Sequence, residues 1–420
     1  MTTVSTVFDA GDRELAGALF EQIRQMSMGR EGITRPSYTE TETAAMQVVE
    51  KVAREAGLAT RIDAVANLVV DLPSSATGKP VWVGSHFDSV PEGGNYDGLA
   101  GVIAGLLCLL KAKQLGYCDR PLSLIGLRGE EAAWFGKAYL GSYAFFGALT
   151  PEDMDRPHRD TGRPMRESFA AVGVDEALVT SKKPLVDPSE IAAWFELHIE
   201  QGPILEAQDL PVGVVTGIRG NFRHLDAHCL GVAGHSGAVP REMRYDAVFA
   251  LSHLLSRLDD QWGNLVAEGA DLVVTTGMIG TNPQEHALSR IAGDVGFSLE
   301  MRSQSVDTLN RYHAIVLEQC ALVEAERGVR FELGERIDTA PAVLDAALME
   351  NTREACRELS MPFMDIGSGA GHDAAIFQKN GVPAAMVFVR NQGGSHNPEE
   401  AMDLDDFMKG CEVLYRAMTR

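Results

Sequence analysis

The sequence predicts an α/β protein, in which helices cover a buried sheet and a separate α+β unit is inserted into the chain. Two observations support this. Short apolar runs alternate with helical patterns up to about residue 213 and again after about residue 330. Between them, segments of alternating polarity are interleaved with two helical stretches, which is typical of an independent α+β unit.

In the first part, amphipathic helical patterns cover 12–28 and 39–57. The second begins with Thr39 as a potential N-cap and Glu42 three residues later, which predicts a capping box. The apolar stretch 98–115 predicts a further helix. Buried strands are expected in four apolar runs, at 67–72, 81–84, 122–127 and 192–198.

The middle part has strand patterns at 222–230, 272–279 and 295–301, and helical patterns at 245–258 and 306–327. The last part predicts helices at 344–359 and 372–380 and a buried strand at 382–389. We therefore predict a catalytic domain in two parts, 1–213 and 330–420, with a domain inserted at 214–329.

Composition narrows the class of protein. No stretch approaches the roughly 20 apolar residues of a membrane span, so no membrane association is expected. A net charge of −22 repels phosphate backbones and anionic lipid surfaces, so we expect no nucleic-acid partner. The six cysteines have no paired spacing and the first residues lack the features of a secretory signal, which favours a cytoplasmic protein.

Five segments place a candidate metal ligand beside a predicted strand end. Each residue taken singly is more often a capping or surface group than a ligand. Jointly they combine the imidazoles and carboxylates that a two-metal hydrolytic site needs. The candidates are His86 with Asp88, Asp97, the pair Glu130 and Glu131, His198, and His396.

A two-metal site needs two divalent ions roughly 3.5 to 4 Å apart that share a carboxylate, with another carboxylate left as general base. Asp97 could be the shared carboxylate. We assign Glu130 as the base and Glu131 as a ligand. Asp88, two residues after His86, could accept its second ring N–H and set the tautomer. Such a site needs no serine or cysteine nucleophile.

Seven segments of the chain form a recognisable series, in this order: GITRPSY, GSHFDSVPEGGNYDG, GEE, ELHIEQGPILE, GHSGAVPREMRYDA, GAGHDA and SHNPEE. With them, the chain resembles the hydantoinase/carbamoylase family of amidases, in the M20 metallopeptidase superfamily, over nearly its whole length. The family includes N-carbamoyl-L-amino acid hydrolases, β-ureidopropionases and allantoate amidohydrolases. The resemblance implies a zinc-peptidase-like mixed sheet flanked by helices, with an inserted lid that forms a homodimer interface.

For the site, the resemblance implies two divalent ions per subunit, as Zn, Mn, Co or Ni. His86, Asp97 and His198 would hold one ion, and Asp97, Glu131 and His396 the other. Glu130 falls at the position of the general base.

The resemblance also implies roles for residues around the metal centre. His235 would polarise the scissile carbonyl, commonly from the partner subunit, and Arg302 would bind the substrate carboxylate. Gln201 and His372 correspond to further substrate contacts. Without the resemblance, His235 would be interpreted as a turn residue and Arg302 as a surface ion-pair partner.

The chain departs from the family pattern at two places. Ser289 stands where the family usually has an asparagine that contacts substrate, with Ala292 in place of a proline. After the glutamate pair, the family's usual Gly-Ser-Arg-Phe is replaced by Ala132, Ala133, Trp134 and Phe135. Trp134 would indicate either a bulkier or more aromatic substrate or repacking behind the site.

These observations predict metal-dependent hydrolysis of a linear C–N amide bond in a small N-substituted amino acid, most typically an N-carbamoyl-L-amino acid. A related deacylase, dipeptidase or hydrolytic deaminase is the alternative among hydrolases. A catalytically silent homologue that binds amino-acid-like ligands is the alternative from another class. The sequence leaves open the substrate side chain, its enantiomer, the physiological metal and the pathway.

Overall fold

The computed structural model describes residues 6–420, which divide into two compact units. The larger unit contains the described residues up to Thr216 together with Val343–Arg420, and the smaller contains Gly217–Ala342. Residues 330–342, assigned from the sequence to the catalytic domain, lie in the smaller unit. They do so because β13 (Arg330–Glu332) and β14 (Ile337–Thr339) pair with β7 (Gly220–Leu230).

The larger unit is built on a nine-stranded mixed sheet in the order β1-β2-β4-β3-β5-β17-β6-β15, with β16 also paired to β6. Its four central strands are parallel and buried along their whole length, so their carboxyl ends meet at one edge. These are β4 (Leu122–Leu127), β3 (Val81–His86), β5 (Ala193–Ile199) and β17 (Ala384–Val389). The outer strands are β1 (Ala59–Ile62), β2 (Leu68–Asp71), β6 (Val212–Ile218), β15 (Ala342–Val343) and β16 (Phe363–Ser368).

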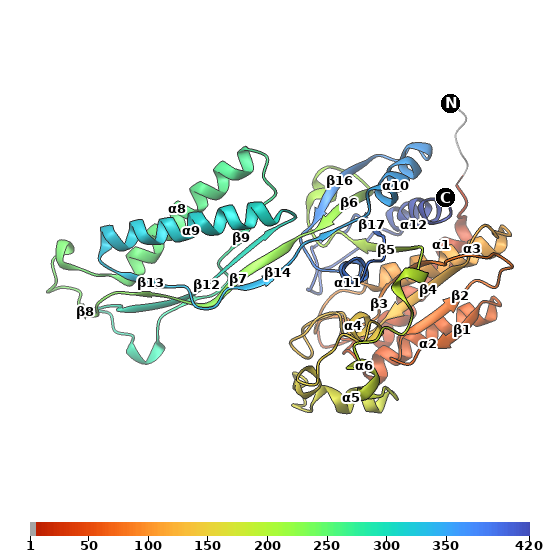
Figure 1. Cartoon of the computed structure of the whole chain (residues 1–420), viewed down its shortest axis with the longest axis horizontal. Helices are drawn as coiled ribbons and strands as arrows, with labels where there is room; N and C mark the ends of the chain where they lie inside the picture. Colours follow the sequence, from red (N-terminus) through yellow and green to blue (C-terminus); the bar gives the residue numbers. More distant parts are fainter. Residues whose placement is uncertain (1–5) are drawn as a thin grey trace. The chain divides into compact units, whose positions relative to one another are not determined.

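One face of this sheet is covered by α3 (Leu99–Gln114), which is apolar all round and buries 13 of its 16 residues. Gly101 lets the helix approach the sheet closely, since a Cβ there would lie 2.3 Å from the carbonyl oxygen of Leu197. Three further helices, labelled in Figure 1, share the same hydrophobic core. They are α1 (Ala10–Met26), α2 (Glu40–Glu55) and α12 (Leu404–Met418).

The other face carries two tryptophans that are register partners on β3 and β5, Trp82 and Trp194. Trp194 stacks on Phe377 of α11 (Asp373–Lys379), with ring centroids 3.8 Å apart. Trp82 meets Phe145 of α4 (Leu140–Phe145) edge to face. Helices therefore cover both faces, and the predicted fold class is confirmed. The remaining helices of this unit are α5 (Met165–Ala171), α6 (Glu176–Val179), α7 (Ile204–Ala207) and α10 (Ala346–Glu358).

The capping box predicted for α2 does not form. Thr39 is the N-cap, but its hydroxyl donates to the carbonyl of Pro36 instead of closing the helix end. Glu42 is fully buried and accepts the N–H groups of Tyr38 (2.6 Å) and Gly129 (3.1 Å). It also pairs with the buried guanidinium of Arg128, and this long-range ion pair replaces the local cap.

The smaller unit has an antiparallel sheet centred on β7 and β12 (Asp294–Ser303). Two long helices, α8 (Ala247–Ala267) and α9 (Val306–Arg327), form one hydrophobic core with the inward residues of this sheet (Figure 1). Besides β13 and β14, the short strands of this unit are β8 (Gly234–His235), β9 (Val273–Thr275), β10 (Ile279–Gly280) and β11 (Arg290–Ile291). Between residues 6 and 420, no helix is both long enough and apolar enough to cross a membrane.

Candidate functional site

The carboxyl ends of the four central strands bring the sequence-predicted ligands of the larger unit together. His86 is the last residue of β3, and His198 is the penultimate residue of β5. Glu130 and Glu131 follow β4 after two residues, and His396 lies in the loop after β17. Asp97 comes from the loop between β3 and α3. Parallel strands that end at one edge commonly place ligands there in α/β proteins.

The carboxylate of Asp97 is the centre of this arrangement. Its Oδ1 lies 3.4 Å from Nε2 of His86 and 3.1 Å from Nε2 of His198. Its Oδ2 lies 3.3 Å from Nε2 of His396, which in turn is 3.2 Å from Oε1 of Glu131. The ligand atoms thus form two groups, each within 4.8 Å, that have only Asp97 in common.

These distances fit metal coordination. Ligand atoms about 2.0–2.1 Å from a tetrahedral ion are separated by about 3.3 Å. The three spacings to Asp97 and the spacing between His396 and Glu131, from 3.1 to 3.4 Å, match this edge length. Imidazole nitrogen and carboxylate oxygen form a donor set that suits first-row divalent metals. The residues of each group are therefore suited to hold a divalent cation.

Hydrogen bonds orient the two buried imidazoles. Nδ1 of His86 lies 3.1 Å from the carbonyl oxygen of Asp88, and Nδ1 of His198 lies 2.9 Å from that of Ile199. A proton on each Nδ1 leaves Nε2 with its lone pair toward Asp97. Gly98 is required beside them, because its φ is +66° and a Cβ there would lie 2.4 Å from the ring of His86.

Asp88 organises more of the site than the sequence indicated. Its Oδ1 lies 3.3 Å from Nδ1 of His86. The same carboxylate accepts the backbone N–H groups of Glu130 (2.9 Å) and Glu131 (3.1 Å). It also accepts the hydroxyl of Ser37 (2.7 Å), which sequence reasoning missed. Ser37 lies in the GITRPSY segment, and its distance from Asp88 along the chain left no local pattern that would have identified it.

The site concentrates buried negative charge. Burial raises the pKa of Glu130 well above its usual value, and neighbouring Glu131 raises it further against the effect of His86. Burial also raises the pKa of Glu131. Hydrogen bonds to Asp97 and Glu131 raise the pKa of His396 to about 11. Because burying an unpaired carboxylate costs free energy, the cluster strongly favours the binding of cations.

Three further predicted residues lie at the cluster. Oε2 of Glu130 is 3.8 Å from Nε2 of His86. His372 packs edge to face on His198, and burial together with His198 lowers its pKa well below the usual value, so its ring is neutral. Gln201 donates from Nε2 to Oδ2 of Asp97 (2.7 Å). Its buried Oε1 has no hydrogen-bond partner among residues 6–420.

Trp134 does not belong to this cluster. Its side chain is 1% exposed, its N–H donates to the carbonyl of Ser89 (2.7 Å), and its ring stacks on His158. Of the two interpretations that the sequence left open, the structure favours repacking behind the site. Trp134 therefore gives no support for an aromatic substrate.

The remaining predicted residues lie in the smaller unit. His235 is exposed on β8, where it pairs with Arg290 of β11, and its Nδ1 accepts the N–H of Gly237. Ser289 precedes β11, and its carbonyl accepts the N–H of Ser236. Arg302 lies on β12 and contacts both carboxylate oxygens of Glu300 at 3.0 Å. His235 and Ser289 are therefore neighbours, whereas Arg302 belongs to another strand.

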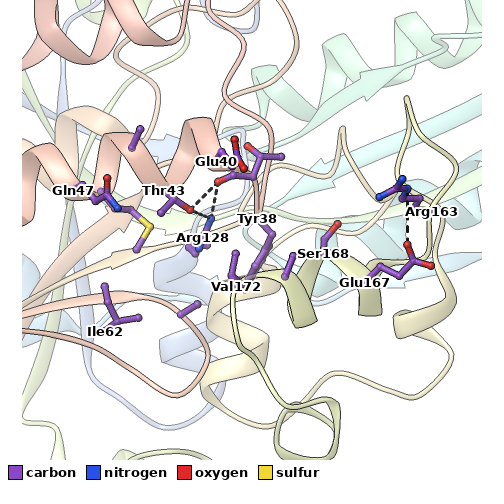
Figure 2. Close-up of a pocket in the computed structure, with 15 residues that line it drawn as sticks. Tyr38, Glu40, Thr43, Gln47, Ile62, Arg128, Arg163, Glu167, Ser168 and Val172 are labelled. Carbon is purple, nitrogen blue, oxygen red and sulfur yellow. Dashed lines mark hydrogen bonds and ion pairs between the residues drawn. The ribbon is translucent and has the colours of Figure 1, made fainter.

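A cavity of about 730 Å³ lies beside α2 and α5, and Figure 2 shows its lining. Arg128 reaches toward Thr43 there, and Arg163 pairs with Glu167. None of the residues around Asp97 lines this cavity. Arg128, which lines the cavity, pairs with Glu42, and Glu42 accepts the N–H of Gly129 next to Glu130. Because the residues around Asp97 do not line the cavity, we do not assign it to the candidate site.

Comparison with known proteins identifies the family. The model of Peptidase family M20/M25/M40 matches residues 82–420. The chain belongs to this family. The match covers every strand end around Asp97, and the chain is accordingly an M20 hydrolase.

This M20 chain has relatives of similar length. It is 32% identical to an N-carbamoyl-L-amino-acid amidohydrolase of Paenarthrobacter aurescens, over 94% of the chain and 95% of the relative. It is 31% identical to an allantoate amidohydrolase of Bacillus subtilis, over 92% and 91%. A solved amidase of the hydantoinase/carbamoylase family from Burkholderia multivorans superposes with a TM-score of 0.86, at 29% identity and 97% coverage of both chains. The resemblance inferred from the sequence is confirmed.

Proposed function

We propose that this M20 hydrolase is a metal-dependent amidohydrolase that cleaves N-carbamoyl-L-amino acids. The observation that carries the proposal is the pair of ligand groups that share Asp97, with Glu130 beside them. The name of the Paenarthrobacter aurescens relative supports the choice of substrate.

Two divalent ions are proposed, one held by His86, Asp97 and His198 and the other by Asp97, Glu131 and His396. Bound divalent ions lower the pKa of water and polarise a carbonyl, and so supply a nucleophile at neutral pH. Asp88 keeps Nε2 of His86 available as a ligand by contacting Nδ1. The donor set is compatible with Zn, Mn, Co or Ni.

Glu130 is proposed as the general base and acid. Its carboxylate takes a proton from the attacking water and returns it to the amino-acid nitrogen as the C–N bond breaks. The products are the free amino acid and carbamic acid, which decomposes to carbon dioxide and ammonia. The buried position of Glu130 beside His86 suits this role, because a carboxylate there can take the proton and hold it between the two steps.

The other residues singled out in the sequence are proposed to bind substrate. His235 would donate a hydrogen bond to the developing oxyanion, and Arg302 would bind the substrate carboxylate in place of Glu300. The free carboxamide oxygen of Gln201 and the neutral ring of His372 would contact the ureido group. Ser289 would contact substrate from its position next to His235.

Allantoate is the second candidate substrate. The allantoate amidohydrolase of Bacillus subtilis is 31% identical to this chain, almost the same as the 32% of the N-carbamoyl-L-amino-acid amidohydrolase. Allantoate also contains a ureido group beside a carboxylate, so the same residues would serve.

A cytoplasmic homodimer joined through the smaller unit is also proposed. Its support is a set of exposed apolar side chains around the start of α8, namely Met243, Tyr245, Val248 and Phe249. All six cysteines are free, which suits a reducing compartment. Light scattering tests the dimer: Phe249→Asp should give a monomer, and a wild-type monomer would contradict the proposal.

The test of function is an ammonia assay on metal-depleted protein reconstituted with each metal. The substrates are N-carbamoyl amino acids of both enantiomers and allantoate, whose hydrolysis releases ammonia; N-acyl amino acids and dipeptides release none and are assayed for the freed amino acid instead. We expect metal-dependent release of ammonia from the N-carbamoyl-L-amino acids. Glu130→Gln should keep its bound metal and lose about 10²- to 10⁴-fold in kcat, the usual worth of a general base. Activity that survives this substitution would refute the assigned base.

A further inference from the structure

Asp97 is the residue that both ligand groups share, and the segment after β17 holds its carboxylate. The hydroxyl oxygen of Ser395 lies 2.6 Å from Oδ2 of Asp97 and 2.7 Å from Oε2 of Glu400. Ser395 therefore connects the two carboxylates directly. The contact is made at the oxygen of Asp97 that faces His396.

Glu400 also holds the backbone of Asp97. Its Oε1 accepts the N–H groups of Tyr96 (2.8 Å) and Asp97 (3.2 Å). The side chain of Glu400 is buried, so water does not compete for these hydrogen bonds. Through four contacts, Glu400 holds the main chain at Asp97 and Ser395, itself held by Glu400, contacts the Asp97 carboxylate, where Nε2 of Gln201 also donates to Oδ2 (2.7 Å).

The loop before Asp97 is fitted to Glu400. A Cβ on Gly94 would lie 2.1 Å from Cδ and 2.2 Å from Oε1 of Glu400. The backbone at Gly94 thus passes directly against the Glu400 carboxylate, an approach that only glycine allows.

We propose that Ser395 and Glu400 are positioning residues that orient Asp97 so that it presents one oxygen to each ligand group. The inference rests on the metal centre of the proposed function. A carboxylate serving two ions must have its plane fixed, because rotation about Cβ–Cγ moves one oxygen away from His86 and His198 and the other away from His396. Removing such outer partners typically weakens metal binding by about 10- to 100-fold.

The glutamate at 400 allows a conservative and a disruptive substitution to be compared. In Glu400→Gln, the amide oxygen can accept the two N–H groups and the amide nitrogen can donate to Ser395, so every contact can be kept. In Glu400→Leu, the side chain has similar size but makes no hydrogen bond. Glu399 offers a matched control, because it is the adjacent acid in the same segment and is exposed.

The experiment is a calorimetric titration of Zn²⁺ or Mn²⁺ into metal-depleted wild type, Ser395→Ala, Glu400→Leu, Glu400→Gln and Glu399→Leu. We expect the metal Kd to rise about 10- to 100-fold in Ser395→Ala and Glu400→Leu. Glu400→Gln should stay within about threefold of wild type, and Glu399→Leu should not change. Thermal unfolding of each metal-free form shows whether it is folded.

Folded Ser395→Ala and Glu400→Leu that bind metal as tightly as wild type would overturn the inference, as would an equal loss in Glu399→Leu. If Glu400→Leu fails to fold, Ser395→Ala decides, because it removes a single hydroxyl. A wild type that binds metal but hydrolyses no amide overturns only the proposed function. A wild type that binds no divalent metal overturns both.

Discussion

The two units hold their candidate site residues in different ways. In the larger unit, His86, Asp97 and His198 are buried at strand ends, and hydrogen bonds fix each of them. In the smaller unit, His235 and Ser289 are exposed on or beside strands of two residues. We therefore expect substitutions of the buried residues in the larger unit to affect stability more than substitutions of the exposed residues in the smaller unit.

The largest effect is expected from Asp97→Asn. An amide cannot present an anionic oxygen to both ligand groups, and it leaves His86, His198 and His396 without their common partner. We expect loss of both proposed ions and at least about 10³-fold loss of activity, since these ions would supply the nucleophile. Elemental analysis and the ammonia assay measure this. Retention of two ions per chain would contradict the shared role of Asp97.

His235→Ala is expected to lower kcat by about 10²- to 10³-fold, the usual cost of removing an oxyanion donor. Because His235 is exposed, metal content and the unfolding temperature should stay at wild-type values. His286→Ala, which removes another exposed histidine of the same unit, is the control and should retain activity. Loss of bound metal in His235→Ala would break the contrast between the units.

Trp134→Phe tests whether a buried aromatic residue near the site affects specificity. The substitution removes the hydrogen bond to the carbonyl of Ser89, which should cost about 1 kcal/mol of unfolding free energy. The ratio of kcat/KM between aliphatic and aromatic N-carbamoyl amino acids should not change. A changed kcat/KM ratio would show that Trp134 does affect substrate specificity.

A smaller effect concerns the response of the smaller unit to pH. The rings of His224 and His313 stack, with their Nε2 atoms 3.3 Å apart. Nη1 of Arg336 lies 3.0 Å from Nδ1 of His313. Burial lowers the pKa of His224, and burial together with Arg336 lowers the pKa of His313. The folded state therefore binds fewer protons than the unfolded state, and stability falls as the pH drops below about 6.5. Thermal unfolding against pH should show this slope, and replacing both histidines with asparagine should reduce it.

His228 on the same sheet is predicted to act in the opposite direction. Its hydrogen bond to Asp294 raises the pKa of His228, so this contribution to stability is present below about 6.5 and is lost as the pH rises through the folded value. His228→Asn should therefore reduce stability more at acidic than at neutral pH. Identical pH profiles for the His228 and His224/His313 variants would show that the two environments do not differ.

Sequence reasoning identified the residues around Asp97 because they follow short apolar runs that are typical of buried strands. His86, His198 and the Glu130 pair all lie where a strand pattern ends, and parallel strands bring such ends together. The α+β character of the inserted region could also be predicted, since α9 begins and ends at the same residues as the helical pattern in the sequence.

The supporting contacts could not be predicted in this way. Glu400 and Asp97 are 303 positions apart in the sequence. The sequence predicts that Glu42 caps its own helix, but its side chain instead pairs with the buried Arg128. Likewise β13 and β14 are too short to give a pattern, so the end of the smaller unit was placed before them. Each of these depends on a partner that only the folded chain brings near.

The order of the ligands along the chain has a consequence for biosynthesis. His86, Asp97, Glu131 and His198 are translated before residues 217–342, whereas His396 follows them. β6 and β15, which flank the inserted residues, are neighbours in one sheet, so the intervening segment must close into a loop before β17 can complete the sheet. A nascent chain on the ribosome can therefore assemble one set of ligands early, but the second set is complete only when nearly the whole polypeptide has emerged.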